Sequence, residues 1–267
     1  MLHRLPFLLA CLAVSAAPAA ASSTPWLKSD GGAIRIVTSG LSDEDGALRG
    51  ALEIDLKPGW KTYWQAPGEA GVPPEINLAP TSDTRHVELL FPAPERISDA
   101  YATWAGYQHP VALPVVFDFP QAEMAGIVEG TLFLGICETI CVPVEIPFSF
   151  DAGADPDNPA DAITVETAFA ALPDAARADF GVSTASRTES QIEFHVTLPD
   201  EPGAPALFVV PPKHVQITMP ELRKRQGKTA IFTSQALGEA AALKGPLEIG
   251  YTLVAGEKAV AGQIALP

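Results

Sequence analysis

The residues of this chain that could carry out redox or metal chemistry lie in one short stretch, residues 135–143, with the sequence GICETICVP. The stretch holds Cys137 and Cys141, whereas the third cysteine, Cys11, lies in an N-terminal segment that should be removed. Two thiols separated by three residues, with no other cysteine near them, are either a disulfide pair or two metal ligands. The other elements of the chain must then hold this pair and control access to it.

Three kinds of chemistry fit a Cys-x3-Cys pair. A structural disulfide would close a loop of about five residues, which stabilises a fold by roughly 2 kcal/mol, little for a domain with its own core. A copper site would use the soft thiolates that suit Cu(I), with His109, His195 or His214 as a third ligand. Thiol–disulfide exchange would need an accessible pair, in which one thiol attacks and the other resolves.

The segments on either side of the pair predict a hairpin. Residues 127–136 and 142–150 have the pattern of two strands, and Cys141 has the phase of the polar residues, so its sulfur should point away from the core. Fully extended, residues 137–141 would hold the two Cα atoms about 13 Å apart. A disulfide needs less than about 7 Å. Residues 138–140 must therefore turn, which places both cysteines at the neck of a hairpin.

The sequence neighbours of the pair do not activate a thiol. Glu138 and Glu145 would raise a cysteine pKa by like-charge repulsion. No Lys, Arg or His is near in sequence to lower it. From these residues alone, exchange, a structural disulfide and a copper site all stay open.

Two aromatic segments could approach the pair. Residues 59–68 hold two tryptophans and a tyrosine within five positions, bounded by Gly and Pro. They either pack in a core or form an aromatic wall beside the thiols. Residues 98–109 carry Tyr101, Trp104 and Tyr107 without the period of a strand or helix. We expect a surface loop with three large rings there, an unusual arrangement that indicates a function.

The pattern of the whole chain predicts an all-β protein with two β-sandwich domains. Short alternating segments with turn residues between them recur in 24–150 and again in 183–267. Between these, 151–182 reads as a short, partly helical linker. One strand of the first domain, residues 111–119, is interrupted by Pro114, which predicts an edge strand or a bulge.

Two short helices are expected in the linker. Asp161 has the residue type and position to cap a helix that runs to Leu172. Pro173 and Asp174 would start a second helix that ends at Phe180.

The N-terminus predicts export. Residues 1–21 have Arg4 near the start, an apolar run, and three alanines before Ser22, which is the pattern of a secretory signal peptide. No later run reaches the roughly 18 apolar residues of a spanning helix. We expect a mature protein that is soluble and, in a bacterium, periplasmic, where disulfides persist.

The charge excludes one class of partner. The formal net charge is −15, and 17 of the 32 acidic residues lie in 24–150 against seven of the 17 basic ones. An acidic surface of this kind does not suit nucleic acid, whose phosphates require basic surface. We expect no nucleic-acid partner, no resident metal and no other cofactor.

Several motifs together resemble the periplasmic N-terminal domain of the DsbD and ScsB thiol:disulfide interchange proteins. They are GWKTYW at 59–64, Pro67-Gly68, Gly71, Pro73, FPAP at 91–94, Gly106-Tyr107, LPV at 113–115, and residues 137–143 with both cysteines. The resemblance covers about residues 30–150. In ScsB-like members the two-domain layout extends it to nearly the whole mature chain.

This resemblance implies an immunoglobulin-like sandwich with a redox cysteine pair. The pair would receive electrons from a membrane-embedded thiol donor and pass them to periplasmic thioredoxin-like proteins. Cys141 would form mixed disulfides while Cys137 resolves them, and the loop with Tyr101, Trp104 and Tyr107 would be a cap that shields the cysteines. The three-residue spacing is shorter than in the DsbD domain but like that of ScsB-type members. Transmembrane and thioredoxin-like domains are absent from this sequence, so we expect either a separate membrane partner or a different substrate.

Overall fold

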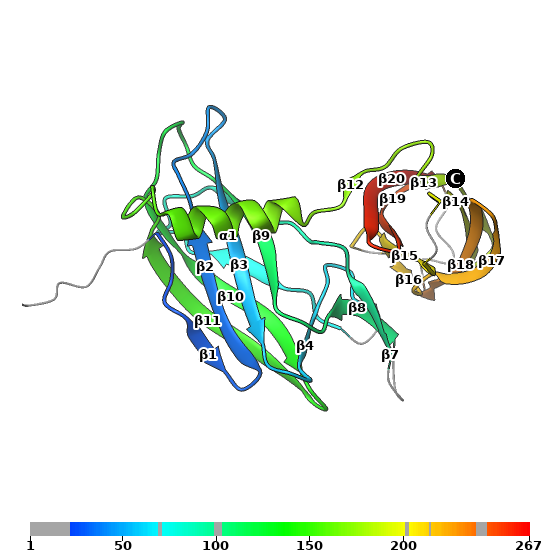
Figure 1. Ribbon diagram of the computed structural model, residues 1–267, viewed down its shortest axis with the longest axis horizontal. Coiled ribbons are helices and arrows are strands. Elements are labelled where there is room, and N and C mark those ends of the chain that lie inside the picture. The colour runs from blue at the N-terminus through cyan, green and yellow to red at the C-terminus, as the bar shows by residue number, and fades with distance from the viewer. Residues whose placement is uncertain (1–21, 69–70, 99–102, 201–202, 214, 239–244) are drawn as a thin grey trace, which may run out of the picture.

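The computed structural model is all-β apart from one helix in the part of the chain that it describes, residues 22–68, 71–98, 103–200, 203–213, 215–238 and 245–267. The strands form two β-sandwiches that lie side by side (Figure 1). The prediction of an all-β protein with two immunoglobulin-like sandwiches and a short helical linker is therefore confirmed. Within the described residues, no helix is long and apolar enough to cross a membrane.

The first sandwich consists of two facing antiparallel sheets. One sheet has the order β1 (Leu27–Ser29), β2 (Gly32–Thr38), β3 (Ala47–Leu56), β9 (Val111–Asp118), β6 (His86–Leu89). The other has the order β11 (Cys141–Asp151), β10 (Ile127–Cys137), β4 (Lys61–Tyr63), β8 (Thr103–Tyr107), β7 (Glu95–Ser98), with β5 (Glu75–Leu78) paired to β10. Strand β11 is thus an outer strand, and it carries Pro143 and Pro147.

Alternation of side chains builds the first core, as the sequence predicts. In β10, Leu132, Leu134 and Ile136 all point inward and are buried. They pack against apolar residues of the facing sheet, among them Leu52 and Phe117. Apolar burial on this scale is the main favourable contribution to folding.

Strand β9 corrects one expectation. It lies between β3 and β6, so it is not an edge strand, and its pairing with β3 runs without a bulge. Pro114 is tolerated because β6 pairs with β9 only as far as Leu89 and Val115. The next residue, Leu90, donates its backbone N–H to the Pro114 carbonyl, which requires no N–H from proline.

The helix α1 (Pro159–Ala170) covers the outer face of the first sheet, across β2, β3 and β9 (Figure 1). Its N-cap is Asn158, whose side chain accepts from two backbone N–H groups, and Pro159 follows at the start of the helix, where its missing N–H costs nothing. The expectation that Asp161 caps the helix is wrong. Asp161 lies in the first turn, 3.8 Å from Arg35. Burial raises the pKa of Asp161, the positive charge of Arg35 lowers it, and the negative charge of Asp155 raises it further.

The second predicted helix does not form. Residues Asp174–Ala175 form strand β12, which pairs in parallel with β20 (Lys258–Leu266), and Ala176 donates to the Ala261 carbonyl. These long-range backbone hydrogen bonds outweigh the local helix signals of the segment, which the sequence alone cannot reveal.

The second sandwich also has two sheets. One has the order β12, β20, β19 (Leu247–Ala255), β15 (Pro205–Val210). The other has the order β13 (Gly181–Thr188), β14 (Gln191–Thr197), β18 (Thr229–Leu237), β16 (Gln216–Ile217), with β17 (Glu221–Gln226) also paired to β18. Phe194 and Phe232 lie at the centre of its core.

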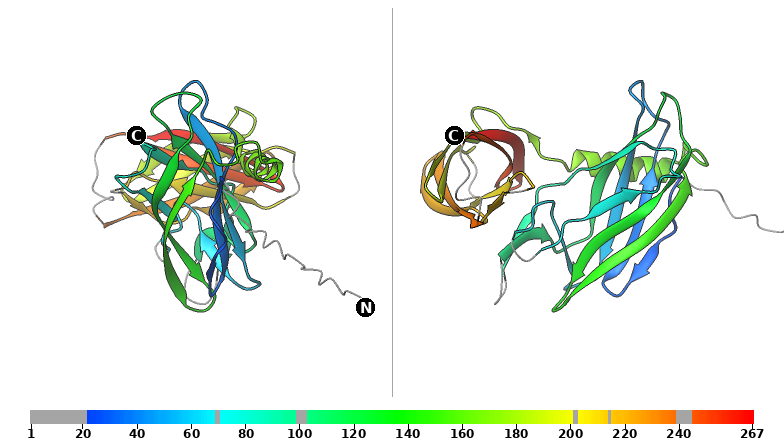
Figure 2. Two further views of the ribbon diagram at one scale, coloured as in Figure 1. Left: turned by 90° about the vertical axis from the view of Figure 1, so that its left-hand side faces the viewer. Right: turned by 180° about the vertical axis from the view of Figure 1, so that it is seen from behind.

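The two sandwiches are in contact. Phe208 of β15 is buried in the core of the first sandwich, where its ring centroid lies 5.9 Å from that of Trp64. Figures 1 and 2 place the second sandwich beside β7 and β8 of the first. The domain boundaries at 150 and 183 stay a prediction about independent folding units.

Candidate functional site

The cysteine pair closes the tip of the long β10–β11 hairpin. The register of the two strands ends at Cys137 opposite Cys141. The two residues form a disulfide with their Cα atoms 4.1 Å apart. The chain therefore turns at residues 138–140, as the distance argument from the sequence requires.

The two sulfurs differ in access. Cys137 is 1% exposed and packs with Tyr63, Ile97 and Trp104. Cys141 is exposed, in agreement with its phase in the strand. A thiolate arriving from solvent therefore meets Cys141 first.

Tyr63 contacts both sulfurs. Its hydroxyl oxygen lies 2.9 Å from Cys141 Sγ and 3.2 Å from Cys137 Sγ. The sulfurs of a disulfide carry no proton, so the tyrosine O–H is the donor. The same O–H can donate to whichever sulfur becomes a thiolate when the disulfide opens, and hydrogen bonds to charged groups are the stronger ones.

Sequence reasoning left open whether this segment packs in a core or forms an aromatic wall beside the thiols, and it did not single out Tyr63. Both interpretations of the segment apply, each to a different residue. Tyr63 faces the disulfide, whereas Trp64 is fully buried in the core of the first sandwich. The alternation of a strand, applied to residues 61–64, is the signal that separates the two.

Trp104 lies beside the buried sulfur. It is 6% exposed, and its ring meets that of Tyr63 edge-on, with 6.4 Å between the centroids and 67° between the planes. The ammonium group of Lys61 lies 4.4 Å from the centre of the Trp104 ring. Such a cation–π contact contributes about 0.5–2 kcal/mol.

The expectation of an exposed surface loop at residues 98–109 is wrong, because part of this segment is strand and two of its rings are buried. Strands β7 and β8 make a hairpin there, and both Trp104 and Tyr107 are buried in β8. Tyr107 donates its hydroxyl to the Pro92 carbonyl at 2.9 Å, and burial raises its pKa well above the ordinary value of 10.0. It packs in the core of the first sandwich, and Tyr101 lies outside the described residues.

A cation reaches the site from another strand. In the register of β4 and β10, Lys61 is the partner of Cys137. A nearby cation favours the thiolate over the thiol. Sequence reasoning found no such residue because it considered only neighbours along the chain.

The candidate metal ligands do not gather. His195 of β14 lies in the second sandwich, with a ring nitrogen 2.7 Å from the carboxylate of Glu193, and His109 is exposed in the turn after β8. His214 lies outside the described residues. Within the part of the chain that the structure describes, no three His, Cys, Asp or Glu side chains are grouped as metal ligands would be.

Comparison with known proteins finds a matching family model and a solved structure with a similar fold. Residues 37–151 match the family described as "Thiol:disulfide interchange protein DsbD, N-terminal". The N-terminal periplasmic domain of ScsB from Proteus mirabilis has a similar structure, with a TM-score of 0.78 and 22% identity over 92% of this chain and 99% of that chain. No curated protein matches the sequence.

A second solved structure is too dissimilar to indicate a shared fold. The C-terminal domain of the antigen I/II-family protein AspA from Streptococcus pyogenes aligns with 92% of this chain and 99% of its own, but with 9% identity and a TM-score of only 0.18.

The family match spans the disulfide hairpin, Tyr63 and Trp104. Residues 37–151 thus match the N-terminal domain family of the thiol:disulfide interchange protein DsbD, and the chain shares the fold of the periplasmic ScsB domain.

Proposed function

We propose that this chain is a periplasmic thiol–disulfide exchange protein. The Cys137–Cys141 pair passes electrons between a membrane-embedded thiol donor and thioredoxin-like proteins. One observation carries the proposal: the disulfide is asymmetric, with Cys141 exposed, Cys137 buried, and the Tyr63 hydroxyl within hydrogen-bond distance of both sulfurs. The signal-peptide pattern of residues 1–21 and the periplasmic origin of the ScsB domain support the compartment.

Reduction of the pair begins at the accessible sulfur. A donor thiolate attacks Cys141 Sγ, a new S–S bond forms, and the Cys137–Cys141 bond breaks. The electron pair of that bond goes to Cys137 Sγ, which Tyr63 stabilises as a thiolate until it takes up a proton. A second donor thiolate then attacks the donor sulfur of the mixed disulfide and releases Cys141. Two electrons and two protons have entered the pair, and the donor has become a disulfide.

Delivery to the next protein is the reverse sequence. The Cys141 thiolate attacks the disulfide of a thioredoxin-like partner and forms a mixed disulfide. Cys137 then attacks Cys141 Sγ, so the intramolecular disulfide forms again and the partner leaves as a dithiol. The 4.1 Å separation of the two Cα atoms keeps Cys137 in place for this resolving step.

A purely structural role fits the geometry less well. The disulfide joins the last register pair of a hairpin that ten other consecutive pairs already hold together. A bond that closes so small a loop adds only about 2 kcal/mol. Nothing within the described residues favours the copper alternative, because no third ligand gathers with the two sulfurs.

A trapping experiment tests the proposal. With Cys137 replaced by Ala, Cys141 should accumulate a mixed disulfide with a thioredoxin-like protein, because the resolving thiol is gone. With Cys141 replaced by Ala, the buried Cys137 should trap little. A redox titration of the wild-type pair should give a potential above about −300 mV, the range of disulfides that exchange. A lower potential, with neither variant trapping a partner, would mean that the disulfide is structural.

A further inference from the structure

The segment that holds the disulfide on one side contacts the second sandwich on the other. Tyr63 faces the two sulfurs, and its neighbour Trp64 faces away from them, with its ring against Phe208 of the second sandwich. Phe208 is buried within the core of the first sandwich. A shift of the second sandwich would therefore move Trp64, the residue that follows β4 and is bonded to Tyr63.

The β7–β8 hairpin is arranged in the same way. Ile97 and Trp104 are register partners that face Cys137. The adjacent register pair, Arg96 and Ala105, lies on the opposite face. There the Arg96 guanidinium donates to the carbonyl of Pro220 in the second sandwich.

Arg96 is held in a partly buried setting. Burial lowers its pKa, and the negative charge of Glu221 acts in the opposite direction. Although the Arg96 residue as a whole is exposed, its guanidinium is a charged donor to the Pro220 carbonyl, and charge-assisted hydrogen bonds are stronger than neutral ones. This contact therefore restrains the hairpin that carries Trp104.

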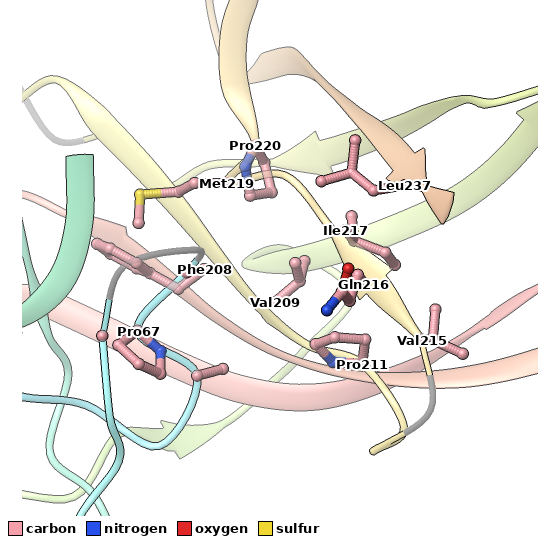
Figure 3. Close-up of a pocket in the computed structure, with 13 residues that line it drawn as sticks. Pro67, Phe208, Val209, Pro211, Val215, Gln216, Ile217, Met219, Pro220 and Leu237 are labelled. Carbon is pink, nitrogen blue, oxygen red and sulfur yellow. The ribbon is translucent and has the colours of Figure 1, made fainter. Parts of the chain in front are cut away.

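The loop after β4 completes the connection. The Ala105 carbonyl accepts from the Trp64 N–H at 3.1 Å, and the Ala105 N–H donates to the Pro67 carbonyl at 3.0 Å, so loop and hairpin form one unit. Pro67 lies on the wall of a pocket of about 800 Å³ that is shared with the second sandwich. Figure 3 shows Pro67, Phe208 and Met219 together at one end of this pocket.

The pocket makes the contact between the sandwiches discontinuous. Beside the pocket, Phe208 enters the first core, Ala206, Val210, Met219 and Val254 pack against it, and Arg96 donates to the Pro220 carbonyl. Met219 packs against the first core from the second sandwich and approaches the backbone at Gly68.

We propose that the second sandwich is a clamp that holds β4 and the β7–β8 hairpin over the disulfide and thereby limits the reactivity of the Cys137–Cys141 pair. Arg96, Phe208 and Met219 act as positioning residues, because they reach the sulfurs only through Tyr63 and Trp104. The proposal assigns a role to the second sandwich within the proposed exchange function. A purely stabilising interface would lower the unfolding midpoint when cut, but it would leave the reactivity of the folded protein unchanged.

The test measures reduction of the disulfide by dithiothreitol in the full chain. One dithiothreitol thiolate attacks Cys141 Sγ, Cys137 leaves, and the second thiolate closes the cyclic disulfide, so two electrons and two protons enter the pair. Arg96→Gln and Met219→Ala should each raise the second-order rate constant by about fivefold, the factor that corresponds to about 1 kcal/mol of lost restraint. Arg96→Lys keeps a long, positively charged donor for the Pro220 carbonyl, whereas glutamine is shorter and neutral, so the lysine variant should restore a rate near that of the wild type.

Matched controls separate the clamp from general loosening. Arg49→Gln removes an arginine that pairs with Glu166 at 2.9 Å on the outer face of the first sheet. Met124→Ala removes a methionine that packs on the first core. Both controls should stay within about twofold of the wild-type rate, since their contacts are exposed or distant from the interface. Far-ultraviolet circular dichroism of each variant checks that it is folded at the assay temperature.

The outcomes decide between the two roles of the interface. If dithiothreitol reduces the disulfide of the Arg96→Gln and Met219→Ala variants at the rate of their controls, or more slowly, the clamp proposal is wrong. Either variant suffices if the other does not fold. Failure of the exchange function itself would appear separately, as a wild-type protein that traps no partner through Cys141, and it would leave the rate comparison with dithiothreitol intact.

Discussion

The hydroxyl oxygen of Tyr63 lies 2.9 Å from Cys141 Sγ, and the same oxygen lies 3.2 Å from Cys137 Sγ. One proton donor thus serves both the sulfur that is attacked and the sulfur that leaves. Because the donor comes from β4 and the sulfurs from β10 and β11, the geometry depends on three strands of one sheet.

Tyr63→Phe should slow reduction of the disulfide by about tenfold. The variant keeps the ring but removes the hydroxyl that lies 3.2 Å from Cys137 Sγ and could donate to the departing thiolate, and a hydrogen bond to a charged group contributes about 1.5–3 kcal/mol. The rate constant with dithiothreitol measures the effect. Tyr107→Phe is the control, because its hydroxyl donates to the Pro92 carbonyl instead. Equal rates for wild type and Tyr63→Phe would show that the contact is incidental.

Trp104→Ala should speed oxidation of the reduced pair by small oxidants, since the ring covers the buried sulfur together with Tyr63 and Ile97. It should also lower the free energy of unfolding by about 3–5 kcal/mol, the usual cost of removing a buried tryptophan ring. Stopped-flow oxidation and denaturant titration measure the two effects. Trp26→Ala, at a half-exposed ring over Arg35, should change neither by much. Unchanged oxidation in Trp104→Ala would remove this residue from the proposed cap.

Ile140→Ser should weaken exchange with protein partners while leaving the reaction with dithiothreitol unchanged. Ile140 is 77% exposed in the turn between the two cysteines, so it stabilises little in the free protein. An exposed apolar side chain next to the reactive sulfur has the position of a docking contact. Rates with a thioredoxin-like protein and with dithiothreitol, compared at one pH, separate docking from chemistry. Ile163→Ser, on an exposed face of α1, is the matched control. A parallel loss of both rates would contradict the docking role.

Asp161→Asn should raise the unfolding midpoint at neutral pH. Burial raises the pKa of Asp161 above its ordinary value of 3.8 in the folded protein, so the folded state binds the proton more tightly than the unfolded state. The charged carboxylate therefore destabilises the fold as pH rises through the folded pKa, and the amide avoids this cost. The advantage of Asn should disappear below the ordinary pKa, where both states are protonated. If the unfolding midpoint of Asp161→Asn instead rose relative to that of the wild type as the pH fell, the pKa of Asp161 would be lowered in the folded protein. The contact with Arg35 would then outweigh burial.

The domain boundaries can be tested by expression of residues 22–172 alone. We expect this fragment to fold and to form the disulfide, since the first sandwich and α1 have their own cores. Its unfolding midpoint should be lower than in the full chain, because Trp64 loses the Phe208 ring. Circular dichroism melting measures both points. A fragment without a cooperative transition would show that the two sandwiches fold only together.

The sequence predicts the elements with one-sided burial well. The β10–β11 hairpin alternates because one side faces the core, and from this alternation the exposure of Cys141 and the turn at 138–140 follow. The β7–β8 hairpin escaped prediction because Ile97 is the single buried residue of β7, whereas the four residues 104–107 of β8 are all buried. Neither strand therefore alternates between buried and exposed residues.

Contacts between strands that are distant along the chain could not be predicted from the sequence either. Lys61 lies opposite Cys137 only because β4 pairs with β10 in one particular register. Residues 173–181 likewise have local features of a helix, but the helix does not form because β12 pairs with β20. In each case the decisive partner is distant along the chain, so no local pattern carries the information.

The prolines of β11 bear on how copies of this protein meet each other. An outer strand presents unpaired N–H and C=O groups to which a strand from another molecule can add. Pro143 and Pro147 stand in the same phase of β11, opposite Gly135 and Thr131 in an unbroken register with β10. Proline is accommodated in a paired strand where its missing N–H faces away from the partner strand. Their missing N–H groups therefore fall on the open edge and interrupt the row of donors there. The hairpin can carry an exposed, reactive sulfur at its tip while the edge beside it resists edge-to-edge aggregation.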